Sequence, residues 1–204
     1  MASVKQSSKK RLSRKERAER QMQELFFDTQ RELIWTRTTN DGYSTIPRTF
    51  PIVMQAIDHQ SKGTPAGHTL FCLWARSPDH PLVTIENPAI FAHEAGFSGE
   101  RAVHTWRQKM KKLEELNFIM SVKGASGDYH YVLLLNPNVA VERMHQKGLV
   151  QRELYIRFKD YLGDIGALSD IDDYLEMLDR LEAAKKKLAP PPKKNVQAKK
   201  TKPK

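Results

Sequence analysis

Residues 97–135 read FSGERAVHTWRQKMKKLEELNFIMSVKGASGDYHYVLLL. This stretch decides the fold class, because a basic helical segment runs directly into two apolar-alternating segments joined by a small turn. Its first part has apolar residues at steps of three and four: Val103, Trp106, Met110, Leu113 and Leu116. That spacing forms one apolar stripe. It predicts a helix that Ser98 caps, that ends near Leu116, and that sits on a core with Trp106 inside.

The second part predicts a β-hairpin over residues 118–135. If residues 125–128 form the loop, position 124 faces position 129 and the strand register follows. The pairs on one face are then all apolar: Val122 with Tyr131, Met120 with Leu133, and Phe118 with Leu135. Because side chains alternate along a strand, we expect these pairs to form the packed inner face. Lys123 and His130 then stand on the other face near the tip.

The residues before this stretch complete a helix-turn-helix pattern. PLVTI, residues 81–85, is short and β-branched and predicts a strand. Asn87 is a typical N-cap with Pro88 at the first helical position, so a helix follows and stops at Gly96. Two helices would then meet through a three-residue turn, which is helix-turn-helix spacing.

PAIFAHEAGFSGERAVHTWRQKMKKLEELNFI, residues 88–119, followed by the hairpin resembles the winged-helix domains of bacterial repressors and plasmid replication initiators. The continuation YHYVLLLNPNVAVERM, residues 129–144, is more similar to initiators. The resemblance covers residues 82–145, about a third of the chain. It implies a mainly α fold with a small β-hairpin wing, a winged helix-turn-helix with additional N- and C-terminal helices. It also implies sequence-specific binding of double-stranded DNA in replication initiation or transcriptional regulation on a plasmid or mobile element.

Long hydrogen-bond donors lie opposite the apolar stripe, and such donors suit base edges and phosphates. We expect Arg101 to contact guanine, with His104, Thr105 and Gln108 as further base contacts. Other residues of the helix are expected to contact phosphates, and residues of the wing are expected to reach the minor groove. The predicted DNA-binding set is Ser98, Arg101, His104, Thr105, Arg107, Gln108, Lys111, Lys112, Lys123 and His130.

The distribution of charge also points to a local binding face. The 204 residues carry a formal net charge of +10. Residues 1–20 hold +6 and residues 185–204 hold +9, so residues 21–184 net to −5. Acid concentrates at 164–182, whereas residues 100–123 hold six Lys/Arg against three Glu. A basic helix on an acidic body indicates a binding face, and the tails would add sequence-independent attraction.

The rest of the chain is expected to support this core, residues 81–137. A basic disordered tail is expected over residues 1–20, and another over 189–204. Residues 21–80 are expected to hold a helix through Trp35, a hairpin turn at Asn40–Gly42, and helices over 50–63 and 64–77. Residues 138–188 are expected to hold C-terminal helices. Their apolar stripes need a partner surface, either the N-terminal helices or a second copy, and we predict a homodimer.

The remaining features favour a cytoplasmic, non-enzymatic protein without cofactor or metal. Cys72 is the sole cysteine, and no apolar run near the start indicates a signal peptide or membrane span. His68 and Cys72 have i, i+4 spacing, but no further local ligand accompanies them. Two alternatives to DNA binding stay open. The winged helix could be a protein-interaction module with nonspecific nucleic-acid-binding tails, using acidic residues 164–182, or the chain could bind structured RNA.

Overall fold

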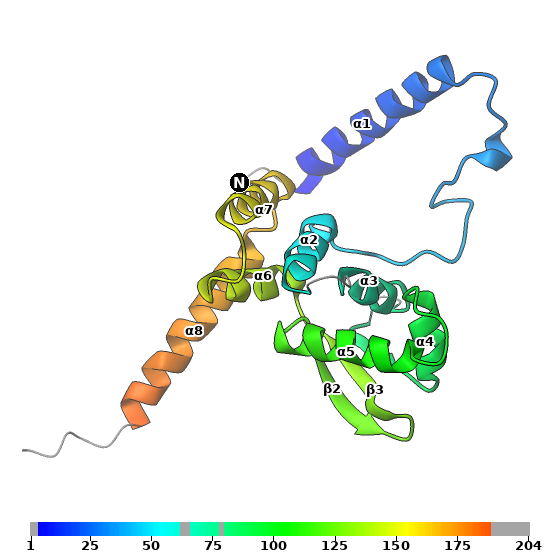
Figure 1. The fold of residues 1–204 in the computed structure, drawn as a ribbon. Helices are drawn as coiled ribbons and strands as arrows, with labels where there is room; N and C mark the ends of the chain where they lie inside the picture. Colours follow the sequence, from blue (N-terminus) through cyan, green and yellow to red (C-terminus); the bar gives the residue numbers. More distant parts are fainter. Residues whose placement is uncertain (1–3, 62–65, 78–79, 189–204) are drawn as a thin grey trace, which may run out of the picture. The chain divides into compact units, whose positions relative to one another are not determined.

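The computed structural model describes residues 4–61, 66–77 and 80–188. The chain divides into two compact units, Met1–Tyr43 and Ser44–Lys204. Within the described residues the protein is mainly helical, with one small antiparallel sheet of three strands (Figure 1). This confirms the predicted mainly α class with a β-hairpin. None of the described helices is both long and apolar enough to cross a membrane.

The first unit is built on one long helix, α1 (Val4–Leu25), followed by a 3-10 turn, η1 (Arg31–Leu33). The prediction of a disordered tail over residues 1–20 is therefore wrong from Val4 onward, and the helix ends well before Trp35. Residues 4–25 contain no glycine or proline and are rich in Lys, Arg, Glu and Gln, which are good helix formers despite their charge.

The predicted hairpin at Asn40–Gly42 is absent, because residues 40–47 form no strand. Asn40 instead closes a turn: its backbone N–H donates to the Thr36 carbonyl at 3.0 Å, and its side-chain oxygen accepts from the Thr36 N–H at 2.9 Å. An isolated two-stranded hairpin is marginal in water. With no third strand beside it among the described residues, the predicted hairpin does not form, and the turn lies at Thr36–Asn40 instead.

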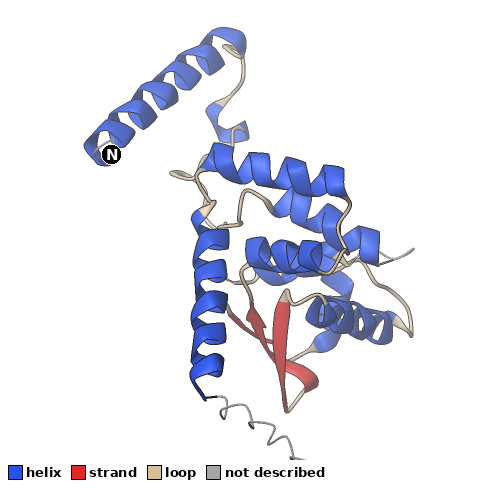
Figure 2. Ribbon diagram, turned by 90° about the vertical axis from the view of Figure 1, so that its left-hand side faces the viewer, coloured by secondary structure: helices blue, strands red, loops and turns tan. Residues whose placement is uncertain are grey.

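The second unit packs helices and one small sheet around a single core (Figure 2). Its elements, in chain order, are α2 (Phe50–Gln60), α3 (Gly67–Ala75), β1 (Leu82–Thr84), α4 (Pro88–Glu94), α5 (Ala102–Glu115), β2 (Ile119–Gly124), β3 (Gly127–Leu134), α6 (Pro137–Gln146), α7 (Arg152–Ile165) and α8 (Ser169–Leu188). The two early helices are shorter than predicted, and the expected Thr64-Pro65 start and Gly63 stop lie outside the described residues. Asn87 and Asn136 cap α4 and α6 through their side chains, as their Asn-Pro sequences favour.

The sheet has the strand order β1-β3-β2, with both pairs antiparallel. Val122 pairs with Tyr131 and Met120 with Leu133, which confirms the predicted register. The tip differs, because Gly124 pairs with Gly127 after a register shift. The connection is therefore two residues long, Ala125 and Ser126, where four were predicted. Gly127 has φ +117°, a conformation that favours glycine.

The predicted assignment of faces is wrong for two of the three pairs, whereas Phe118 of the third pair is fully buried, as predicted. Met120 and Val122 are 58% and 64% exposed, whereas Val132 is fully buried. The inner face of the sheet is formed by Val83, Ser121 and Val132 in one row, with Ile119 and Leu134 beside it. Both faces of this hairpin are apolar, so an alternation of period two does not say which of them meets the helices. We call the exposed set the outer sheet face: Leu82, Met120, Val122, Tyr131 and Leu133.

A chain of polar side chains, buried at Thr49 and Asn138, joins three helix starts. The Thr49 hydroxyl, at the N-cap of α2, donates to Asn138 Oδ1 at 2.6 Å. Asn138 Nδ2 in turn donates to Asp170 Oδ2 at 2.8 Å, and Asn136 Nδ2 donates to the same oxygen at 3.0 Å. Asp170 is the second residue of α8. It ties the first turn of α8 to α6.

Candidate nucleic-acid interface

The helix α5 presents two chemically distinct sides. Trp106, Met110 and Leu113 are buried along one side, as their spacing predicts. The Trp106 ring makes an edge contact with Tyr129 of β3, with centroids 5.9 Å apart, and a tilted contact with Phe91 of α4 at 6.4 Å. These contacts hold α5 between α4 and the hairpin, so the direction of its opposite side is set by the core.

The opposite side of α5 carries most of the predicted DNA-binding residues. Exposed members of the set are Ser98, Arg101, His104, Arg107, Gln108, Lys111 and Lys123, while Thr105 and Lys112 are half-buried. His104 and Gln108 lie one turn apart, and their Nε2 atoms are 3.1 Å from each other. The side therefore offers a row of donors one helical turn apart, beginning at Arg101 and ending at Lys111.

The turn between α4 and α5 is longer than predicted. The first helix ends at Glu94 and the second begins at Ala102, so seven residues connect them. Gly96 and Gly99 adopt φ of +85° and +79°, which bend the chain twice before the helix starts. Ser98 is consequently not the N-cap but an exposed loop residue. Arg101 occupies the N-cap position and makes no side-chain capping bond.

Arg107 links the helix to the hairpin. A side-chain carbon at Gly127 would stand 3.4 Å from the Arg107 guanidinium, so the two are in close approach. Burial raises the pKa of Tyr129, with Glu114 and Asp128 adding to the effect and the Arg107 charge opposing it. Glu114 also accepts two hydrogen bonds from Ser121 of β2, at 3.0 Å from the N–H and 2.7 Å from the hydroxyl. Helix and hairpin thus form one continuous surface.

His130 does not belong to this surface, which corrects its prediction as a wing contact. Its ring is buried, with Nδ1 at 2.8 Å from the Ser126 hydroxyl and 3.1 Å from the Ile85 carbonyl. The face inversion described above turns it inward. Lys123 remains exposed at the tip, and its Nζ lies 3.9 Å from Asp128 Oδ1. An exposed pair of this kind contributes little and is easily exchanged for another partner.

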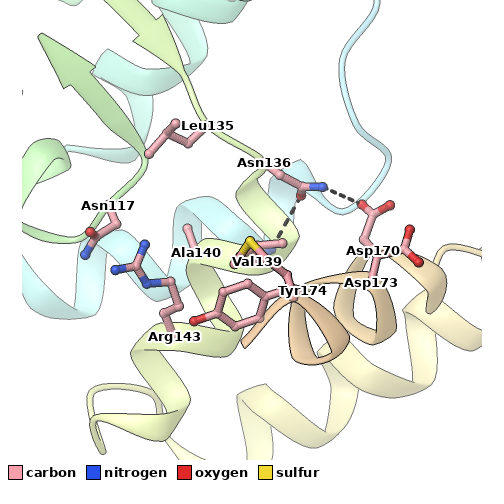
Figure 3. A pocket seen from close by; sticks show the side chains of 10 residues that line it. Asn117, Leu135, Asn136, Val139, Ala140, Arg143, Asp170, Asp173 and Tyr174 are labelled. Atoms are coloured by element: carbon pink, nitrogen blue, oxygen red, sulfur yellow. Dashed lines mark hydrogen bonds between the residues drawn. The ribbon is translucent and has the colours of Figure 1, made fainter. Parts of the chain in front are cut away.

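A groove of about 400 Å³ that the sequence did not indicate lies between α6 and α8 (Figure 3). Its lining is mainly apolar, with Leu135, Val139 and Met177 among the lining residues. Arg143 and Tyr174 stand at one side in Figure 3, and the Asn136–Asp170 hydrogen bond closes the other. No periodicity signals such a groove, because it arises where the first turns of α8 cross α6.

The possible metal pair His68 and Cys72 is close but makes other contacts. Cys72 Sγ lies 3.7 Å from His68 Nε2 and donates to the Glu94 carbonyl at 3.4 Å. Burial raises the pKa of the Cys72 thiol, the Glu94 carboxylate adds to this, and Arg76 opposes it. In the part of the chain that the structure describes, no three His, Cys, Asp or Glu side chains gather as metal ligands.

Comparison with known protein families, with curated proteins and with solved structures finds no match to this chain.

Proposed function

We propose that this protein is a winged-helix, sequence-specific binder of duplex DNA that inserts α5 into the major groove. The observation that carries the proposal is the exposed row of Arg101, His104, Gln108 and Lys111, directly opposite the buried stripe of the same helix. The major groove of B-DNA is about 12 Å wide and admits one α-helix. A helix that is held rigidly on one side and carries donors on the other suits this groove.

The arrangement of elements supports the winged-helix part of the proposal. The helices α4 and α5 pack on each other, and the β2–β3 hairpin follows α5 without a long connection. The strand β1, which precedes α4, completes the sheet beside β3. The seven-residue turn is longer than in the simplest helix-turn-helix, but it leaves the order helix, helix, wing unchanged.

The individual residues have distinct proposed roles. Arg101 lies at the start of α5, where recognition helices meet base edges, and its guanidinium can bind guanine in two places. Gln108 can exchange its contact with His104 for a bidentate contact with adenine. The remaining donors act on phosphates or at the margin of the base contacts: Thr105, Arg107, Lys111, Lys112 and, from the hairpin, Lys123. Ser98 stands in the loop ahead of the helix.

The biological setting is proposed from the resemblance to plasmid initiators and repressors. The protein would act in replication initiation or transcriptional regulation on a plasmid or mobile element. Residues 21–184 net to −5, so attraction to DNA would come from the α5 side and the basic ends of the chain. Such a distribution orients the protein on a polyanion, because the acidic parts are repelled.

The test is selection of bound sequences from a random duplex library at roughly physiological salt. We expect enrichment of one motif by the wild type and by an Arg157→Ala control, which removes an exposed arginine of α7. The double variant Arg101→Ala/Gln108→Ala should lose the motif while keeping salt-dependent binding to any duplex. Retention without a motif for the wild type would contradict sequence-specific binding. A palindromic motif would favour a regulator, and direct repeats an initiator.

A second candidate function is protein interaction, and the outer sheet face favours it. Five apolar side chains stand exposed together across three strands there, and patches of this kind often mark protein contacts. Under this alternative, changing Met120 and Tyr131 to Ser would abolish binding of the protein partner, while Arg101→Ala/Gln108→Ala would leave that binding unchanged. DNA binding predicts the reverse pattern.

A further inference from the structure

The helix α8 has an apolar face wider than its own unit covers. Its first turns pack against α6, where Ile171 is buried. Its later turns run outward (Figure 1). There Leu175, Met177 and Leu181 are 40%, 44% and 49% exposed, and Leu178 is half-buried. We call these four residues the α8 seam.

The spacing of the seam fits a helical partner. Leu178 and Leu181 of the seam continue the steps of three and four that begin at Ile171 and Tyr174, and this is the repeat by which two helices interlock side chains. Ile171 is used within the unit, so the seam proper begins after it. A face that is apolar over this length and open to water is unfavourable unless another surface covers it.

The charges along α8 indicate the kind of partner. Residues 169–182 contain six Asp/Glu and one Arg, whereas positions 185–187 are three lysines in the same helix. The helix is thus acidic over its first three quarters and basic at its end. Such a helix is self-complementary only when a second copy runs in the opposite direction, because a parallel copy would align acid with acid.

We propose that α8 pairs with α8 of a second copy in an antiparallel, two-fold symmetric dimer. In the proposed register, Leu178 lies opposite the partner's Leu181, and Leu181 lies opposite the partner's Leu178. The same register places positions 172 and 173 opposite the partner's positions 187 and 186. The apolar side chains then meet in the middle of the helix pair, and acidic residues of each copy face lysines of the other copy at both ends. The symmetry is that of an isologous interface.

The first measurement is the mass of the full chain by light scattering at tens of micromolar. We expect a dimer for the wild type and for Ile156→Glu, a control that adds one negative charge at an exposed apolar site on α7. Leu178→Glu/Leu181→Glu should give a monomer with unchanged helical circular dichroism. A monomeric wild type, or a dimer that survives the double variant, overturns the proposal.

Orientation is tested by charge exchange and by distance. Asp172→Lys/Asp173→Lys should weaken the dimer by roughly two- to tenfold, and adding Lys186→Asp/Lys187→Asp should restore it. Only the antiparallel pair predicts that restoration. In a Cys72→Ser background, spin labels at position 180 should lie close together across the dimer. Labels at position 172 should be about 20 Å further apart along the axis, from a rise of ~1.5 Å per residue. Equal distances at both positions would indicate a parallel pair and overturn the proposal.

These measurements contain no DNA. Failure of the dimer therefore leaves the proposed DNA binding by α5 untouched, and failure of DNA binding leaves the dimer untouched.

Discussion

The imidazole ring of His130 lies directly over Gly124 across the hairpin, in the space that any larger side chain at position 124 would occupy. We predict that Gly124→Ala lowers the free energy of unfolding by about 1–3 kcal/mol, because the ring is held by Ser126 and cannot yield freely. Urea unfolding measures this. Gly163→Ala is the control: that glycine is exposed in α7, and the nearest atom to an added carbon is Leu168 Cδ1 at 3.9 Å. It should raise stability by about 0.5–1 kcal/mol.

The two faces of the hairpin can be compared with one substitution. Val122 and Val132 lie on neighbouring strands, the first exposed and the second fully buried. Val122→Thr should change the free energy of unfolding by no more than about 0.5 kcal/mol, whereas Val132→Thr should cost about 1–3 kcal/mol for burying a hydroxyl. If Val122→Thr were the costlier change in urea unfolding, the assignment of faces would be reversed.

Two buried threonines differ in whether their hydroxyl is bonded. Thr49 donates to Asn138, while Thr69 Oγ1 is buried with no partner in the described part of the chain. Thr49→Val should therefore cost about 1–3 kcal/mol, since it leaves Asn138 Oδ1 without its donor. Thr69→Val should be neutral or stabilising. Similar losses for both variants in thermal unfolding would argue against the polar chain as a stabilising element.

Tyr155 should make stability depend on alkaline pH. Its hydroxyl donates to buried Glu142 at 2.6 Å, and burial, then this hydrogen bond and the carboxylate charge, raise the pKa of Tyr155 well above its usual value. Above about pH 10 an unfolded tyrosine loses its proton while the folded Tyr155 keeps it. The contribution of Tyr155 to the free energy of unfolding therefore falls as the pH rises. Tyr155→Phe should cost about 1.5–3 kcal/mol at pH 8.

The difference between wild type and Tyr155→Phe should narrow at about pH 10.5, as measured by urea unfolding at the two pH values. Tyr161→Phe changes a half-buried tyrosine on the same helix and is the matched control, with only a small expected effect on the free energy of unfolding at pH 8. If the loss of stability caused by Tyr155→Phe were the same at both pH values, the pKa of Tyr155 would not differ between the folded and unfolded chains, and the prediction would be wrong.

Lys111 should contribute to DNA affinity without contributing to sequence choice. It is exposed at the far end of the α5 row, away from the helix start. Lys111→Ala should weaken binding to all duplexes alike and reduce the slope of log affinity against log salt by about one. Fluorescence anisotropy over a salt series measures the slope. An unchanged slope would remove Lys111 from the phosphate contacts.

Local patterns in the sequence were sufficient for much of the fold. The stripe of Trp106, Met110 and Leu113 predicted the buried side of α5, and Asn87 with Pro88 predicted the start of α4. The hairpin register also followed from the sequence, because cross-strand pairing depends on residues a few positions apart. These features are determined by interactions within one element or between neighbours in the chain.

Other features depended on what each element packs against. Both sides of the hairpin are apolar, so only the position of α5 and the Val83–Val132 pairing decide that Met120 faces water and His130 faces inward. The turn before α5 extends past Ser98, because Gly96 and Gly99 bend the chain before the helix starts at Ala102. Sequence alone thus determined which residues share a side of each helix or strand. Only the tertiary structure decided which of those sides is buried, because burial is a property of the contact and not of the element.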